Sequence, residues 1–149
     1  MSFEIAHLSF EETGLFPKVM TDYINDESHL EPFYLYKPQI SALKNAIEDR
    51  DKKNIDRKTL AKVIAERYAK NAPAASEFAL KNIKRLEDSN TFTVTTGHQL
   101  CLFTGPLYFI YKIISTINLS QKLREEYPAN HFVPVYWLAS EDHDFAEIN

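Results

Sequence analysis

The residues best equipped for chemistry lie near the end of the chain, in a short acidic segment. This segment, Ser140-Glu141-Asp142-His143-Asp144, places three carboxylates and one imidazole in four consecutive positions. Carboxylates this close raise one another's pKa values, and a neighbouring imidazole can be held charged, so the segment suits acid–base chemistry. Two other interpretations stay open: metal ligation by Glu141 with His143 or by Asp142 with Asp144, and a solvated acidic turn. We expect a functional role, with the metal requirement unknown.

A second candidate segment runs between two glycines, Gly97 and Gly105. It follows a predicted strand and leads to Pro106, which suits a first helical turn because its missing N–H is not needed there. Glycines let the backbone approach an anion, and a helix N-terminus adds partial positive charge worth roughly 0.3–1 kcal/mol. Lys112, in the second helical turn, is placed to reach a phosphate. The alternative is that the glycines serve only the geometry of the turn. The candidate cofactor-binding residues are Thr96, Gly97, His98, Gln99, Thr104, Gly105 and Lys112.

Two familiar nucleotide motifs and one nucleophile are disfavoured. The chain contains neither G-x-G-x-x-G nor G-x-x-x-x-G-K-[ST], so it lacks the dinucleotide fingerprint and the P-loop. Cys101, the single cysteine, stands between Leu100 and Leu102 with no obvious base beside it. We therefore predict a small buried hydrophobic residue there rather than a nucleophile.

The pattern around these segments predicts a strand, a helix and a second strand. Residues 91–96 alternate as a strand does, and residues 132–139 are almost continuously apolar, as in a parallel strand buried on both faces. The helix between them runs from Pro106 to about Glu126. Such a right-handed βαβ unit indicates an α/β, Rossmann-like fold, in which ligands lie beyond the carboxyl ends of the strands. The helix is predicted to bury Leu107, Ile110, Tyr111, Ile114 and Ile117.

The upstream part of the chain is predicted to be helical. Helices are expected over residues 15–23, 38–50 and 73–87, and another is expected to begin after the N-cap Asp56. We accordingly divide the chain into an N-terminal helical region, 1–90, and the start of a Rossmann-like core, 91–149. Because one βαβ unit leaves sheet edges uncovered, we expect more chain to follow and the fragment alone to be marginally stable. The stripe predicted for the helix after Asp56 is Leu60, Val63, Ile64 and Tyr68.

Composition narrows the class of protein. The chain has 17 basic and 21 acidic residues, a formal net charge of −4 and no Lys/Arg run, which disfavours nucleic acid as a partner. No apolar stretch reaches the about 18 residues that span a bilayer, and the N-terminus lacks a signal-peptide pattern. With a single cysteine, a disulfide scaffold is excluded. We therefore expect a cytoplasmic protein with no membrane partner.

Two motifs together resemble the cysteine-adding ligase family of bacillithiol biosynthesis. The first combines Thr96-Gly97-His98-Gln99 with residues 105–108 and 112–115, and the second is the run 133–145, from Val-Pro-Val-Tyr-Trp to Glu-Asp-His-Asp-Phe. Strong similarity covers residues 91–149. The related nucleotidyltransferases carry His-x-Gly-His in the first loop, and this chain lacks that pattern.

The resemblance implies a Rossmann core, a coiled coil later in the full-length protein and a possible homodimer through the rest of the chain. It also implies a ligase that uses ATP or ADP as cofactor, activates a carboxylate and forms an amide between cysteine and glucosaminyl malate. On this interpretation residues 96–99, Thr104, Gly105 and Lys112 line the nucleotide pocket, and Glu141, Asp142, His143 and Asp144 bind or orient the amine or sugar. Another nucleotidyltransferase-like enzyme and a non-catalytic metabolite-binding module remain as alternatives.

Overall fold

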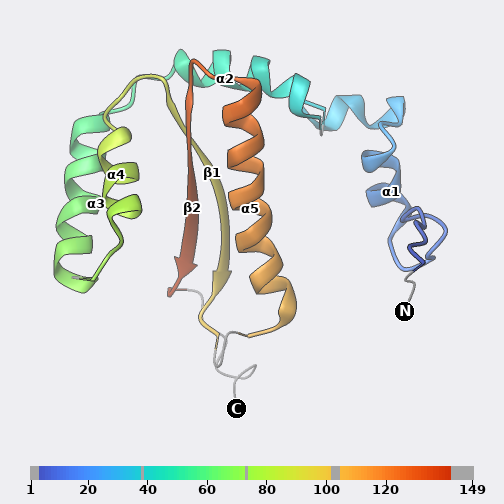
Figure 1. The fold of residues 1–149 in the computed structure, drawn as a ribbon. Coiled ribbons are helices and arrows are strands. Elements are labelled where there is room, and N and C mark those ends of the chain that lie inside the picture. Colours follow the sequence, from blue (N-terminus) through green and yellow to red (C-terminus); the bar gives the residue numbers. More distant parts are fainter. Residues whose placement is uncertain (1–3, 38, 73, 102–104, 142–149) are drawn as a thin grey trace. The chain divides into compact units, whose positions relative to one another are not determined.

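A computed structural model describes residues 4–37, 39–72, 74–101 and 105–141 of the chain. The chain forms two compact units, residues 1–52 and 53–149. Figure 1 shows the helices and strands of both units.

The first unit is built of short helices. They are α1 (Lys18–Ile24), the 3₁₀ helices η1 (Ser28–Phe33) and η2 (Ile40–Ala42), and α2 (Leu43–Asp51). Pro17 is the N-cap of α1, one residue before the helix, where its fixed φ is compatible with the extended backbone. Ion pairs support this unit: Lys18 contacts Asp22 at 2.8 Å, and Lys37 contacts Asp26 at 2.8 Å.

The second unit contains the predicted strand–helix–strand arrangement. After α3 (Arg57–Asn71) and α4 (Glu77–Arg85) come β1 (Thr91–Gln99), α5 (Leu107–Glu126) and β2 (His131–Ala139). The two strands are parallel and paired throughout, from Thr91 opposite His131 to Gln99 opposite Ala139. They lie between the α3–α4 pair and α5 (Figure 1). The predicted α/β class with a parallel βαβ unit is confirmed.

Side-chain caps set the starts of α3 and α4. The carboxylate of Asp56 accepts a hydrogen bond from the Thr59 amide at 3.0 Å, as predicted for an N-cap. Ser76 caps α4 in the same way, accepting from the Ala79 amide at 3.3 Å. Helix α4 therefore begins at Glu77 rather than near residue 73, because the Ser76 hydroxyl satisfies one of its first-turn N–H groups.

On one face of the sheet the core forms around a small residue of α3. Ala61 packs with Leu86 and Val133, and all three are buried, with Ile64 and Val135 beside them. The stripe predicted for α3 is wrong in three of its four members: Leu60, Val63 and Tyr68 are exposed. The helix instead turns Ala61 toward β2, where the absence of a large side chain permits close approach.

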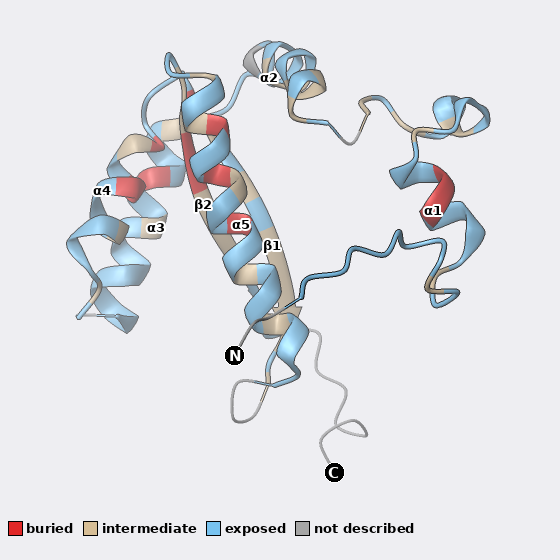
Figure 2. Cartoon of the chain, turned by 45° about the vertical axis from the view of Figure 1, so that its right-hand side comes forward, coloured by how far each residue is buried: buried red, intermediate tan, exposed pale blue. Residues whose placement is uncertain are grey.

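The other face is covered by α5 through two small polar residues and a leucine. Thr116, Ser120 and Leu123 are its buried positions (Figure 2), whereas the predicted core residues Leu107, Ile110, Tyr111, Ile114 and Ile117 are all exposed. The buried hydroxyls donate to main-chain carbonyls one turn earlier, Thr116 to Lys112 and Ser120 to Thr116, each at 2.8 Å. Because their hydroxyls are satisfied within the helix, these small side chains can be buried against the strands.

A further hydrogen bond ties α3 to the sheet. Arg57 Nη1 donates to the Thr91 carbonyl oxygen at 2.9 Å, at the start of β1.

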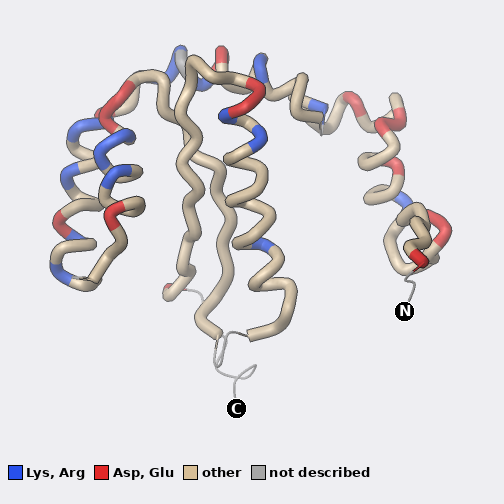
Figure 3. The backbone as a smooth tube through the Cα atoms, in the orientation of Figure 1, with Lys and Arg blue, Asp and Glu red and all other residues tan. Residues whose placement is uncertain are grey.

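The boundary between the two compact units follows residue 52, well before the change of sequence pattern near Ser89. It lies there because α3 and α4 pack with the strands. The division into domains 1–90 and 91–149 stays a prediction. The charged residues of this unit occur in its helices and connections, while β1 and β2 contain no Asp, Glu, Lys or Arg (Figure 3).

Candidate functional site

The candidate segments follow neighbouring strand ends. Since Gln99 lies opposite Ala139 in a parallel pair, the segments after β1 and β2 leave the same edge of the sheet. Of the predicted residues, the structure places Thr96, Gly97, His98, Gln99, Gly105, Lys112 and Glu141. Thr104, Asp142, His143 and Asp144 lie outside the described residues, so their predicted roles stay predictions.

Gly97 is needed where the two strands approach each other. A Cβ atom at Gly97 would lie 2.9 Å from the Trp137 carbonyl oxygen and 3.1 Å from Trp137 Cβ. Any side chain would therefore separate β1 from β2 at the edge where the candidate segments leave the sheet. Gly97 therefore has a structural role, because it lets the two strands approach. Contact of its backbone with a ligand stays a prediction.

Gly105 adopts a backbone conformation that favours glycine. Its φ is +62°, in the left-handed region. A Cβ atom there would also lie 2.7 Å from Cys101 Cβ and 2.8 Å from Cys101 Sγ. The thiol thus occupies the space that a side chain at position 105 would fill.

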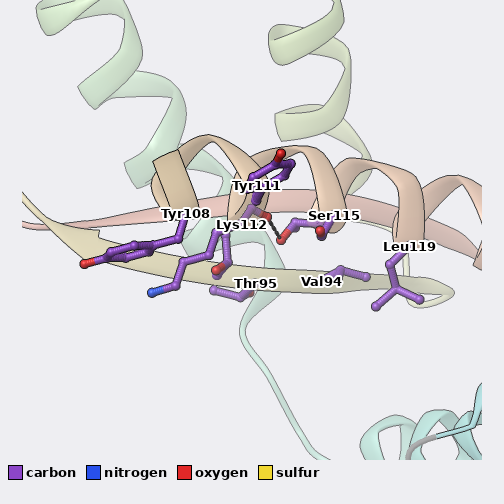
Figure 4. A pocket seen from close by; sticks show the side chains of 9 residues that line it. Val94, Thr95, Tyr108, Tyr111, Lys112, Ser115 and Leu119 are labelled. Carbon is purple, nitrogen blue, oxygen red and sulfur yellow. Dashed lines mark hydrogen bonds between the residues drawn. The ribbon is translucent and has the colours of Figure 1, made fainter. Parts of the chain in front are cut away.

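Lys112 brings a positive charge to the carboxyl end of β1. Its Nζ donates to the Gly97 carbonyl oxygen at 3.3 Å and lies 5.3 Å from the centre of the Tyr108 ring. In Figure 4 the Lys112 side chain extends beside Tyr108 and along β1. It lines a pocket of about 410 Å³ in which no other described lining residue is charged. The pocket is lined by Val94, Thr95, Thr96, Tyr108, Tyr111, Lys112, Ser115, Thr116 and Leu119.

The first turn of α5 carries no acidic side chain of its own. Pro106 is the N-cap of this helix and makes no side-chain cap hydrogen bond. The free N–H groups of such a turn attract anions. Lys112 and the N-terminus of α5 therefore favour a negatively charged ligand at this edge.

His98 is held by contacts on both sides of its ring. Its Nε2 lies 2.7 Å from the Tyr108 hydroxyl, and its Nδ1 lies 3.0 Å from the Gln99 carbonyl oxygen. Because a carbonyl only accepts, Nδ1 is the donor in its contact with Gln99. Tyr108 and Phe109 also pack against the ring, with centroids 5.2 and 5.9 Å away.

The same imidazole corrects the prediction for Cys101. The thiol was expected to be buried with no base nearby, yet it is half-buried and its Sγ lies 3.2 Å from His98 Nδ1. The turn after β1 folds position 101 back onto position 98. The signal that could have shown this was the three-residue spacing between histidine and cysteine, next to a glycine that leaves room for the sulfur.

Glu141, the first residue of the acidic cluster, lies near the exposed ring of Trp137. The Trp137 indole N–H donates to Glu141 Oε1 at 3.3 Å. Trp137 was not singled out from the sequence as a site residue, although its place near the end of β2 puts it beside the predicted cluster. Within residues 4–37, 39–72, 74–101 and 105–141, no three His, Cys, Asp or Glu side chains are grouped to hold a metal ion.

The decisive comparison is with a known family. Residues 3–149 match the family described as bacillithiol biosynthesis BshC, N-terminal Rossmann-like domain. The chain belongs to this BshC domain family. The resemblance inferred from the two motifs is thereby confirmed, and it extends over the upstream helices as well.

Individual relatives agree with the BshC assignment. The chain is 51% identical over 145 residues to a protein of Christiangramia forsetii, covering 95% of this chain and 26% of the relative. It is 48% identical to a protein of Flavobacterium psychrophilum, covering 95% of this chain and 27% of the relative. It is 37% identical to a protein of Bacillus cereus, covering 98% of this chain and 26% of the relative. Each of the three bears the name "Putative cysteine ligase BshC". The chain thus spans about a quarter of the length of these curated relatives.

In the part of the chain that the structure describes, no helix is both long enough and apolar enough to cross a bilayer.

Proposed function

We propose that the chain is the N-terminal part of a ligase that joins cysteine to glucosaminyl malate in bacillithiol biosynthesis. Membership of the BshC domain family supports this proposal, because the relatives are named as cysteine ligases. The structural observation that carries it is the position of Lys112 Nζ, 3.3 Å from the Gly97 carbonyl oxygen, where two parallel strands end together. An α/β sheet binds its ligands at such an edge.

The residues at this edge fit the phosphates of a nucleotide. Lys112 is a cationic donor on the pocket wall, and the first turn of α5 offers main-chain N–H groups without a competing acidic side chain. Thr96 lines the same pocket with a hydroxyl. Bound ATP would supply the activation that turns the carboxylate of cysteine into an acylating group. Lys112 would hold the negative charge of the phosphates beside the end of β1.

The acidic cluster is proposed to serve the other substrate. Glu141 follows β2 at the same sheet edge and accepts a hydrogen bond from Trp137. Carboxylates repel phosphates but attract ammonium groups and accept hydrogen bonds from sugar hydroxyls. The cluster, Glu141 with Asp142, His143 and Asp144, is therefore proposed to orient the amino sugar and to accept the proton that its amine releases when the amide forms.

The substrates can be tested with the purified full-length protein. We would incubate it with ATP, cysteine and glucosaminyl malate and detect the amide product by mass spectrometry. The proposal predicts a product that requires all three reactants and is lost in Lys112→Met. Lys122→Met, which removes a lysine near the other end of α5, is the matched control and should retain activity. A product formed equally well by Lys112→Met would refute the proposed role of this edge.

A further inference from the structure

One edge of β1 is not covered by any strand that the structure describes. β1 pairs with β2 along its whole length, from Thr91 to Gln99, and on that side only. The N–H of His131, the first residue of β2, donates to the Asn90 carbonyl oxygen at 2.9 Å. Because successive residues of a strand direct their main-chain groups to opposite sides, this contact fixes the side for every residue of both strands. In β1 the N–H and C=O groups that face away from β2 are those of residues 91, 93, 95, 97 and 99.

Basic side chains occupy the two ends of this open edge. Arg57 Nη1 donates to the Thr91 carbonyl oxygen at 2.9 Å. Lys112 Nζ donates to the Gly97 carbonyl oxygen at 3.3 Å. Both acceptors belong to residues whose main-chain groups face away from β2, so the two contacts agree with the sides assigned from the strand pairing. A further strand would therefore pair with the edge between Thr91 and Gly97.

Thr93 and Thr95 form the open stretch between these ends. Both residues are exposed, and their N–H and C=O groups have no hydrogen-bond partner in the part of the chain that the structure describes. Solvent-exposed strand edges in native proteins are blunted by charged side chains, proline or a bulge. β1 contains no charged residue and no proline, and its register with β2 is unbroken. The stretch thus has the character of a strand that pairs on both sides.

The opposite edge of the sheet is less suited to pairing. By the same alternation, residues 132, 134 and 136 of β2 face away from β1, and residue 134 is a proline. Because proline has no N–H, a strand beside β2 would lose a hydrogen bond at Pro134. This proline lies opposite Val94, well inside the paired region. A further strand is therefore favoured beside β1 rather than beside β2.

The space beside the open edge is the pocket between β1 and α5. Its β1 wall is made of Val94, Thr95 and Thr96, and none of its described lining residues belongs to β2. Figure 4 shows Lys112 beside Thr95 and Leu119 beside Val94. The Val94 and Leu119 side chains are half-buried, so apolar side chains of a strand seated here would remove their remaining apolar surface from water.

We propose that the outer edge of β1 is the docking surface for a strand of the full-length protein, supplied by the part of the chain that follows residue 149. The chain matches an N-terminal domain and spans only 26% and 27% of two of its relatives, which leaves ample chain to supply the strand. The strand pairs with Thr93 and Thr95, parallel to β1 and β2. It stops short of the Gly97 carbonyl that Lys112 holds, and so leaves the carboxyl edge open. This proposal does not depend on the ligase activity.

Amide hydrogen exchange in the purified full-length protein tests the pairing. If a strand covers the edge, the N–H groups of Thr93 and Thr95 should exchange roughly a hundredfold or more slowly than in a short peptide of the same sequence. Val94 and Thr96, whose N–H groups face β2, are the internal controls and should be slow in either case. Electron-transfer fragmentation in the mass spectrometer resolves neighbouring amides. Exchange of Thr93 and Thr95 at the peptide rate would overturn the proposal.

Dilution separates a strand of the same chain from a strand of a second copy. The exchange measurement is repeated over a range of protein concentrations, with the oligomeric state followed by light scattering. Protection of Thr93 and Thr95 by the same chain should not change with concentration. Protection that disappears when the protein dissociates into monomers would assign the edge to a second copy and contradict the proposal.

A proline variant of the full-length protein gives an independent test. Thr95→Pro removes an outward N–H of β1 and leaves the hydrogen bonds to β2, as Pro134 does on the other strand. Thr95→Ala, the matched control, removes the same side chain but keeps the N–H. We expect Thr95→Pro to lower the midpoint of urea denaturation well below that of Thr95→Ala. Equal midpoints for the two variants would show that no strand pairs at position 95.

Discussion

The ammonium group of Lys112 donates a hydrogen bond to the main-chain carbonyl oxygen of Gly97 across 3.3 Å. This contact fixes a cation of α5 at the carboxyl end of β1, beside the first turn of the helix. The two residues come from segments that the sequence assigned to one anion pocket. The contact between Lys112 and Gly97 is therefore a feature of the predicted anion pocket that substitution can test.

Replacing Lys112 should weaken nucleotide binding. In the full-length protein, Lys112→Met removes the cationic donor of the pocket, and we expect the dissociation constant for ATP to rise about tenfold or more, since a hydrogen bond to a charged group is worth roughly 1.5–3 kcal/mol. Isothermal titration calorimetry measures the constant. Lys122→Met, on the same helix, should bind as wild type does. Unchanged affinity in Lys112→Met would place the nucleotide elsewhere.

A methyl group at position 97 should destabilise the sheet. Gly97→Ala would bring Cβ to 2.9 Å from the Trp137 carbonyl oxygen, and we expect a loss of about 1–3 kcal/mol in the free energy of unfolding. Trp137 is the single tryptophan of this chain, so its fluorescence during urea denaturation reports the affected site. Thr95→Ala, at an exposed position on the same strand, is the control and should change stability less. Equal stability of the Gly97 variant and wild type would show that the strands separate without cost.

Removing Arg57 should weaken the attachment of α3 to the sheet. Arg57→Met loses the 2.9 Å hydrogen bond to the Thr91 carbonyl, whose residue is buried, and should lower the free energy of unfolding by about 1–3 kcal/mol. Arg67→Met removes an exposed arginine from the same helix and should have little effect. Amide hydrogen exchange in α3 is a second readout, because a detached helix exchanges faster. Identical exchange in the two variants would argue against the packing described.

The cap of α3 should make stability depend on pH. The side-chain and main-chain hydrogen bonds from Thr59 lower the pKa of Asp56 below its usual value of 3.8. A lowered folded-state pKa means that the contribution is present above the unfolded pKa and is lost as the pH falls through the folded one. Asp56→Ala should therefore be less stable than wild type at neutral pH, with a gap that narrows below about pH 4.

A second cap variant serves as the control for that pH dependence. Ser76→Ala removes the corresponding cap of α4, whose hydroxyl does not titrate in this range. Its loss of stability, measured by thermal unfolding, should be the same at each pH. If the difference in stability between wild type and Asp56→Ala stayed constant as the pH fell, the cap could not be assigned to an ionised carboxylate.

The strands and the long helix could be predicted because their patterns are local. Residues 91–96 and 132–139 were predicted as strands and lie within β1 and β2, and α5 ends at Glu126 as expected. β1 continues to Gln99, past a glycine that composition alone would mark as a break. The continuation depends on β2, because the missing side chain of Gly97 leaves room for Trp137. The sequence of β1 alone cannot predict this contact with the neighbouring strand.

The buried face of α5 could not be predicted from hydrophobicity. Apolar periodicity selected Leu107, Ile114 and their neighbours, whereas the structure buries Thr116 and Ser120. Their hydroxyls become compatible with burial only through bonds to carbonyls of their own helix. For the same reason Cys101 was misjudged, since its partner His98 becomes adjacent only when the turn after β1 is formed. The acidic cluster beyond Glu141 stays a prediction.

Thiol analysis of cells tests the central proposal most directly. The full-length gene would be deleted and returned either as wild type or as Asp142→Ala/His143→Ala, with the abundance of each protein checked. We predict that deletion removes bacillithiol and accumulates glucosaminyl malate, and that the wild-type gene alone restores the thiol. Unchanged bacillithiol after deletion would contradict the proposed ligase function, and restoration by the double variant would contradict the role of the acidic cluster.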